Sequence, residues 1–165
     1  MSGVNEIQSV LAILEGAPAL LRSSVEALPE PLRKRRPWVD KWSAHETVAH
    51  LAALQPVFAE RLERMLAEDH PRLTSWTPPV EDERSVFQDA DLDEALVRFE
   101  TERGDLVSFL RSLPTEAWAR TADHPDYPRF DVLTMFRHLA LHDGLRLYRL
   151  EQLRMKQDWP EAPVP

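Results

Sequence analysis

The sequence predicts an all-α protein: a four-helix bundle in which a long crossover joins the second helix to the third. Apolar residues recur at helical spacings in four long segments, and only 4 glycines occur among the 165 residues. Most of the 14 prolines lie between these segments, where they would break helices. No stretch alternates apolar and polar residues at the period of a β-strand, and no internal repeat competes with the helical interpretation.

The first helix is expected over residues 4–28. The apolar residues that recur there at helical spacings are Val10, Leu11, Leu14, Leu20, Leu21, Val25 and Leu28. Gly16 and Pro18 interrupt the pattern. Either the helix bends there, or a new helix begins with Pro18 in its first turn, where a missing amide costs no hydrogen bond. Residues 29–42 contain three prolines and a basic cluster, and we expect them to form a loop.

The second helix is expected to begin at Ser43, because Ser43 and Glu46 form an S-x-x-E capping box. It should continue to about Glu68, with a bend at Pro56, whose ring nitrogen cannot donate a hydrogen bond. Residues 69–90 contain three prolines and are long for a connection within one domain. We therefore expect them to cross the whole bundle, so that the second and third helices run parallel.

The third helix is expected over residues 91–112, where Asp91 and Glu94 stand three residues apart at its start. A second proline-rich loop follows. The last helix should begin after Asp131, a suitable capping residue, and end near Lys156.

Composition and charge limit the functions that this chain can have. The size of the chain predicts one domain over residues 1–165, with its core at about 18–156. A formal net charge of −8 argues against a nucleic-acid-binding protein. The absence of cysteine excludes disulfides, thiolate catalysis by the chain itself and cysteine-ligated metals. Since neither a signal peptide nor an apolar run of about 18 residues is present, we expect a cytoplasmic protein without membrane contact.

Three histidines on two of the expected helices are candidate metal ligands. His138 and His142 lie one turn apart on the last helix, so both imidazoles can turn toward one point. His50 on the second helix would complete three ligands for a divalent metal and leave positions open for water or substrate. Such an ion lowers the pKa of bound water to about 7, or activates a bound thiol. Alternatively, the three histidines are partly buried polar residues that only form hydrogen bonds.

The order of these motifs resembles that of the DinB/YfiT-like proteins, over roughly residues 18–153. The residues that carry the resemblance are Trp42, Ser43, Glu46, Val48, His50 and Leu51, then Trp118, His124 and Pro125, and finally His138, His142 and Asp143. The resemblance implies a four-helix bundle with up-down-down-up topology, usually dimeric. It also implies a divalent metal, commonly nickel or zinc, bound by three histidines. The implied activities are metal-dependent hydrolysis, or transfer and isomerisation with a low-molecular-weight thiol such as bacillithiol or mycothiol.

The last helix departs from the family pattern at two positions. His50 matches the ligand on the second helix, but alignment through His142 places Arg146 at the next expected histidine and Arg149 at an expected glutamine. A guanidinium offers no lone pair to a metal, and its positive charge opposes an incoming dication. Three interpretations remain open. His138 replaces the missing ligand, or the site lacks metal and Arg146 binds an anion such as a carboxylate or phosphate, or the histidines are structural remnants.

Two functions follow from these interpretations. The first is a metal-dependent hydrolase or thiol S-transferase that acts on a small molecule, with ligands His50, His138 and His142. Arg146 and Arg149 would then bind an anionic group of the substrate. The second is a non-catalytic, metal-free binding or stress-response protein. In either case Glu46 serves as a capping residue or as an acceptor that orients the His50 ring, and a homodimer is expected from the resemblance.

Overall fold

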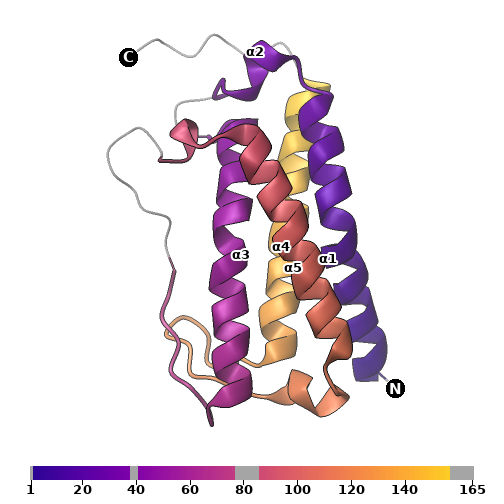
Figure 1. Ribbon diagram of the computed structural model, residues 1–165, viewed down its shortest axis with the longest axis vertical. Helices are drawn as coiled ribbons and strands as arrows, with labels where there is room; N and C mark the ends of the chain where they lie inside the picture. Colours follow the sequence, from indigo (N-terminus) through magenta and orange to yellow (C-terminus); the bar gives the residue numbers. More distant parts are fainter. Residues whose placement is uncertain (1, 38–40, 77–85, 157–165) are drawn as a thin grey trace.

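The computed structural model describes residues 2–37, 41–76 and 86–156, and four long helices dominate it (Figure 1). The elements in chain order are α1 (Ser2–Glu26), α2 (Glu30–Arg33), α3 (Ala44–Ala67), η1 (Val86–Asp89), α4 (Leu92–Ser112), η2 (Thr115–Ala119) and α5 (Val132–Met155). Within the described ranges, β pairing is confined to isolated bridges such as that between Thr121 and Asp131. None of the described helices combines the length and apolar character that a membrane span requires.

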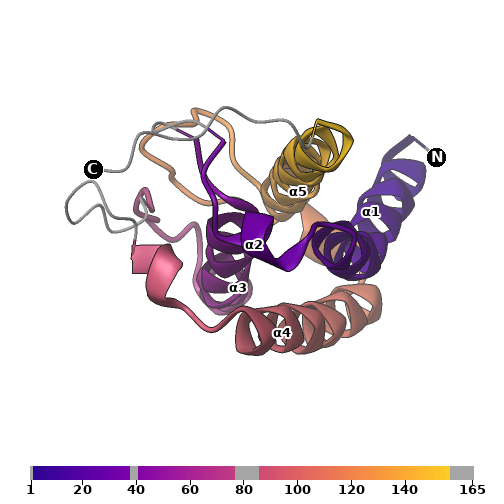
Figure 2. The ribbon, with the colours of Figure 1, turned by 90° about the horizontal axis from the view of Figure 1, so that it is seen from above.

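The directions of the four long helices require a crossover between α3 and α4. α1 and α5 run one way along the bundle, whereas α3 and α4 run the other way (Figure 1). Seen along the bundle, the order around the core is α1, α4, α3, α5, and each neighbouring pair is in contact (Figure 2). Because α3 ends at the end of the bundle opposite to the start of α4, the chain between them has to return along its length. The predicted all-α bundle with up-down-down-up topology is therefore confirmed.

Hydrogen bonds at the helix starts confirm the predicted boundaries. Ser43 Oγ accepts from the amide of Glu46 at 3.1 Å, and Glu46 Oε2 accepts from the amide of Ser43 at 2.9 Å. Asp91 caps α4 through the amide of Glu94 at 2.8 Å, and Asp131 caps α5 in the same way. Each bond satisfies an amide that no carbonyl of the preceding turn can reach.

The structure decides between the two alternatives for the first helix and corrects the prediction of a loop after it. α1 is a single helix that continues through Gly16 and Pro18, so no new helix begins there. The segment expected as a loop contains the one-turn helix α2, with Pro31 in its first turn. Proline is tolerated at this position because the amide it lacks would have no helical partner.

The apolar core consists of two clusters, one toward each end of the bundle. The cluster nearer α2 includes Leu21, Val25, Val48, Leu51, Phe99 and Leu150. The cluster nearer η2 includes Leu14, Phe58, Leu62, Leu110, Met135 and Phe136. A layer of buried polar side chains lies between the two clusters.

Arg103 of α4 lies in this polar layer, is 0% exposed, and bonds to each of the other long helices. Its Nε donates to Gln55 Oε1 of α3 at 2.9 Å. Its Nη1 donates to the carbonyl of Leu14 in α1 at 3.3 Å and to Asp143 Oδ2 of α5 at 2.5 Å. The guanidinium also packs on Phe99, with Cζ 4.7 Å from the ring centre. A shift of one helix along its neighbours would break at least one of these bonds, so the layer sets the relative heights of the four helices.

Candidate functional site

Two histidines from facing helices meet at the side of the bundle where α3 and α5 are neighbours. The Nε2 atoms of His50 and His142 are 3.3 Å apart. His50 is only 4% exposed, and His142 is half-buried. His50 follows the Ser43 cap by about two helical turns, and His142 follows the Asp131 cap by about three. The structure thus brings together two of the three histidines that the sequence suggested as ligands.

Aromatic side chains enclose the His50 ring. The ring centres of Trp42, Trp76 and Phe87 lie 4.7, 5.7 and 5.7 Å from that of His50. Trp42 precedes α3, Trp76 follows it, and Phe87 belongs to η1. Burial, with smaller contributions from Arg146 and His142, lowers the pKa of His50 to about 3. His50 is therefore a neutral imidazole at physiological pH.

Arg146, one turn after His142, occupies the position beside the two imidazoles. Its Nε donates to His142 Nε2 at 3.3 Å, and its guanidinium lies over Trp42 with Cζ 4.6 Å from the ring centre. The guanidinium is half-buried, and burial followed by the nearby charge of Arg149 lowers its pKa. Because His142 Nε2 accepts this hydrogen bond, its lone pair is already in use.

The residues present do not fit a divalent metal ion. An ion shared by His50 and His142 would require the lone pair on each Nε2. Arg146 already uses the one on His142, and its positive charge would repel the ion. Among the residues that the structure describes, no three His, Cys, Asp or Glu side chains are placed to hold a metal. The geometry therefore matches the interpretation in which Arg146 takes the place of the cation.

His138 faces a small pocket next to the histidine pair instead of joining it. This pocket has a volume of about 210 Å³, and its lining includes His50, His124, His138 and His142. The ring of His138 packs beside Tyr127, with centres 5.6 Å apart. Burial is the main cause that lowers the pKa values of His124 and His138. We refer to this space as the histidine pocket.

A second pocket is lined by Trp42 and is strongly basic. Its volume is about 220 Å³, and its lining includes Lys41, Arg146, Arg149 and Lys156 together with Trp42. None of the described residues that line it is acidic. In a chain with a formal net charge of −8, four cations around one small space indicate an anion site. We refer to this space as the cationic pocket.

Glu46 does not orient the His50 ring. Its carboxylate is shared between the capping bond to Ser43 and an ion pair with Arg36, whose Nη2 is 2.5 Å from Oε1. The Nδ1 atom of His50 is buried and has no hydrogen-bond partner in the described structure. The capping role expected for Glu46 is confirmed, and the described structure contains no hydrogen bond between Glu46 and His50.

Several residues of the site were missed by the sequence reasoning. Trp76 and Phe87 enclose His50, and Lys41 and Lys156 complete the cationic pocket. A signal for Lys156 was present in the sequence, because it follows Arg149 by seven residues, a spacing that places it at the end of the same helix. No comparable signal existed for Trp76 and Phe87, which reach His50 only through the path of the crossover.

Acidification is expected to destabilise the protein through His50. The unfolded chain protonates this side chain near pH 6.5, whereas the folded protein does so only near pH 3. Between these values the unfolded state binds more protons, so the free energy of unfolding falls as the pH falls. A pKa of about 3 predicts a loss of roughly 2 kcal/mol between pH 7 and pH 5 from His50 alone. Urea unfolding of wild type and His50→Gln at both pH values measures the difference. Equal losses in the two proteins would contradict the prediction.

Comparison with known proteins gives a family and a solved structure of similar fold. The model of the DinB superfamily matches residues 13–148. YfiT from Bacillus subtilis, described as a probable metal-dependent hydrolase with an unusual four-helix bundle topology, has a similar structure. The TM-score is 0.79 at 20% sequence identity, and the match covers 93% of this chain and 89% of that chain. At this identity the likeness shows a shared fold. No curated protein matches the sequence.

Proposed function

This chain belongs to the DinB superfamily, and we propose that it is a metal-independent member that binds a small anionic molecule in the cationic pocket. The observation that carries the proposal is the position of Arg146. Its Nε donates to His142 Nε2 at 3.3 Å, at the nitrogen that a metal ion would need. A permanent cation therefore stands where the family pattern expects a ligand.

The contacts of Arg146 leave its two Nη atoms available to donate hydrogen bonds to a ligand. The guanidinium packs over the Trp42 ring, and the two Nη atoms form no hydrogen bond to any described residue. A planar guanidinium can bind a carboxylate or phosphate through two parallel hydrogen bonds. Partial burial strengthens such bonds, because less water screens the charges.

The other cations of the pocket favour a ligand with more than one negative charge. Arg149 forms no ion pair with any described residue, and it lies three residues after Arg146 on the same helix face. The like charge of Arg149 contributes to the lowered pKa of Arg146. A bound anion would offset this repulsion, so we infer a phosphate-bearing or polycarboxylate molecule. The histidine pocket would receive its uncharged part.

A metal-dependent hydrolase or thiol S-transferase is the second candidate. The observation that favours it is the 3.3 Å between the Nε2 atoms of His50 and His142. Two ligands at 2.0–2.1 Å from a tetrahedral ion would be separated by about 3.3 Å. The candidate needs a third ligand, and it needs Arg146 to release His142. Metal titration, described in the Discussion, separates the two proposals.

Substitution of Arg149 tests the anion site without touching the histidine pair. Arg149→Gln is expected to weaken binding of inorganic pyrophosphate by about tenfold, because one charge-assisted hydrogen bond is lost. Isothermal titration calorimetry at low salt measures the affinity, and added sodium chloride should weaken it. The matched control is Arg111→Gln, which removes an exposed arginine paired with Glu15 on another face. If wild type shows no saturable binding, or both variants bind like wild type, the proposal fails.

A further inference from the structure

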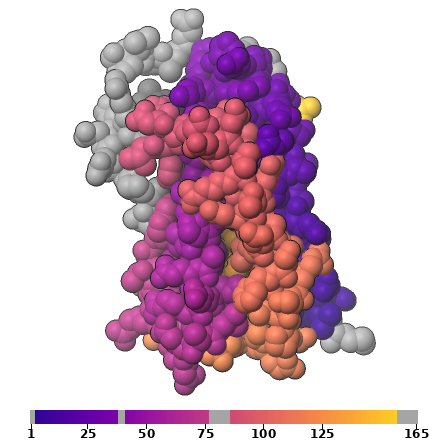
Figure 3. Space-filling model, in the orientation of Figure 1, coloured from indigo at the N-terminus to yellow at the C-terminus, as the bar shows by residue number. Residues whose placement is uncertain are grey.

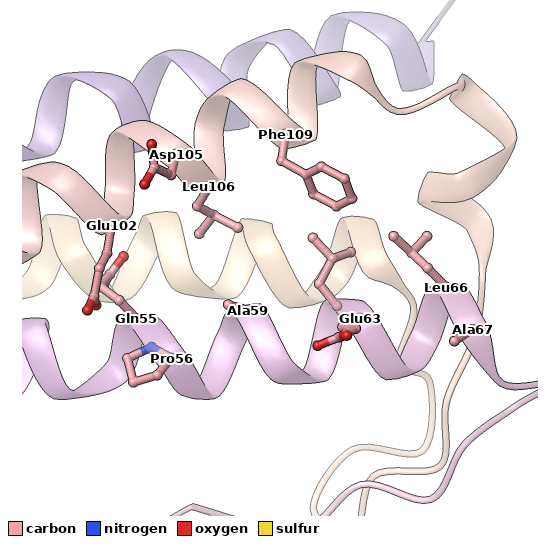
Figure 4. Close-up of a pocket in the computed structure, with 11 residues that line it drawn as sticks. Gln55, Pro56, Ala59, Glu63, Leu66, Ala67, Glu102, Asp105, Leu106 and Phe109 are labelled. Atoms are coloured by element: carbon pink, nitrogen blue, oxygen red, sulfur yellow. The ribbon is translucent and has the colours of Figure 1, made fainter.

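A groove between α3 and α4 lies on a different face of α3 from the histidine and cationic pockets. Its volume is about 750 Å³ (Figure 4). The space-filling view shows the hollow between the two helices (Figure 3). Ligand sites for small organic molecules span about 300–1,000 Å³. The groove is therefore large enough for a molecule and not only for a few waters.

Apolar side chains form the floor and one end of the groove. Ala59 and Leu66 line it from α3, and Leu106 and Phe109 line it from α4 (Figure 4). Phe109 is 49% exposed, a large aromatic surface left open to water. Contact with an apolar ligand would remove this surface from water and so stabilise the complex.

The other end of the groove is polar and negatively charged. There Glu102 of α4 and Gln55 of α3 approach each other (Figure 4). Both polar groups of Gln55 are in use, since Oε1 accepts from Arg103 and Nε2 donates to the carbonyl of Leu51. Glu102 Oε1 accepts from Arg98 Nε at 2.8 Å. Its Oε2 atom, in contrast, is buried and has no hydrogen-bond partner in the described structure.

The charged residues that line the groove in the described structure are all acidic. Glu63 and Asp105 line it together with Glu102, and no described lining residue is basic. A buried carboxylate oxygen without a donor is costly, and an ammonium group is the donor that also matches the charge. An anionic ligand would be repelled, and a neutral apolar one would leave Glu102 Oε2 unsatisfied.

We propose that this groove binds a hydrophobic amine. The ammonium group pairs with the carboxylate of Glu102 at the polar end, and the apolar body extends along Leu106 toward Phe109 and Leu66. A second copy of this chain fits less well, because a symmetric contact through the groove would bring two sets of carboxylates together. The amine site is independent of the anion site, since the two have opposite charge and share no lining residue.

Matched charged and uncharged probes test this proposal. We expect 4-phenylbutylamine to bind wild type at least tenfold more tightly than 4-phenyl-1-butanol in calorimetric titrations at pH 7. Glu102→Gln should remove this preference while leaving the affinity for the alcohol unchanged. Phe109→Ala should weaken both ligands, because it removes apolar contact at the other end. The control Glu15→Gln removes an exposed carboxylate on α1 and should change neither affinity.

Two results would overturn the amine site. One is equal affinity of wild type for the amine and the alcohol, or an amine preference that survives Glu102→Gln. The other is self-association through the groove, which sedimentation would reveal as a dimer that Phe109→Ala dissociates. The side chains of Glu102 and Phe109 are partly exposed, so circular dichroism should show that both variants fold normally.

Discussion

Replacement of Asp143 by alanine is expected to destabilise the protein by about 3–5 kcal/mol, the largest effect of any change considered. Asp143 is 0% exposed, and its Oδ2 accepts from Arg103 Nη1 at 2.5 Å. Its removal leaves the Arg103 charge in the core without an anion, and the desolvation of that charge is then uncompensated. A domain of this size has a total stability of about 5–15 kcal/mol, so the variant should unfold at much lower urea concentration.

A double substitution distinguishes the destabilisation caused by an unpaired Arg103 charge from the stabilisation that the Arg103–Asp143 ion pair contributes. Arg103→Met combined with Asp143→Leu should recover much of the lost stability, because no charge is then buried. Glu151→Ala, on the exposed side of α5, is the control for loss of a carboxylate and should change the free energy of unfolding by under about 0.5 kcal/mol. If Asp143→Ala unfolds at the same urea concentration as this control, the buried ion pair contributes nothing to stability.

Arg146→His is expected to create a metal site at the histidine pair of the proposed metal-free protein. The new imidazole would lie one turn after His142, on the same face of α5 and toward His50. The substitution supplies a third lone pair and removes the positive charge that opposes a dication. We expect the affinity for Zn²⁺ or Ni²⁺ to rise by about 100-fold or more. Atomic absorption and calorimetry on untagged protein measure the bound ion per chain.

The controls for metal binding use the same helix and the same histidines. Arg149→His adds an imidazole seven residues after His142, at the cationic pocket, and should not create the site. His50→Ala introduced together with Arg146→His should abolish the gain. Stoichiometric binding of an ion by wild type, lost on His50→Ala or His142→Ala, would contradict the metal-free proposal. It would favour the hydrolase or transferase candidate instead.

Helix boundaries were predictable because their causes are local. The capping box of Ser43 and Glu46 involves two residues in one turn, and the structure contains both of its hydrogen bonds. Pro18 was harder to interpret. Packing of one face of α1 against the core keeps the helix continuous there, although Pro18 has no amide to donate a hydrogen bond. α2 was missed because a single turn is too short to show an apolar period.

The candidate site was predictable in its members and not in their arrangement. His50 and His142 were identified from spacing and from the family order, and the structure places them 3.3 Å apart. His138 could be judged only from the fold, where it faces the histidine pocket. Asp143 follows His142 in the sequence, but its side chain is the buried partner of Arg103, a contact that joins α4 to α5.

The sequence by itself determined the all-α class, the helix starts, the crossover and the candidate histidines, because periodicity, capping and proline chemistry act within a few residues. Only the tertiary structure decided which side chains share one space. Arg146 donates to His142 and stacks on Trp42, contacts that depend on how α5 packs beside the segment before α3. Packing between these distant segments therefore sets the direction of the Arg146 guanidinium, on which the proposed anion site depends.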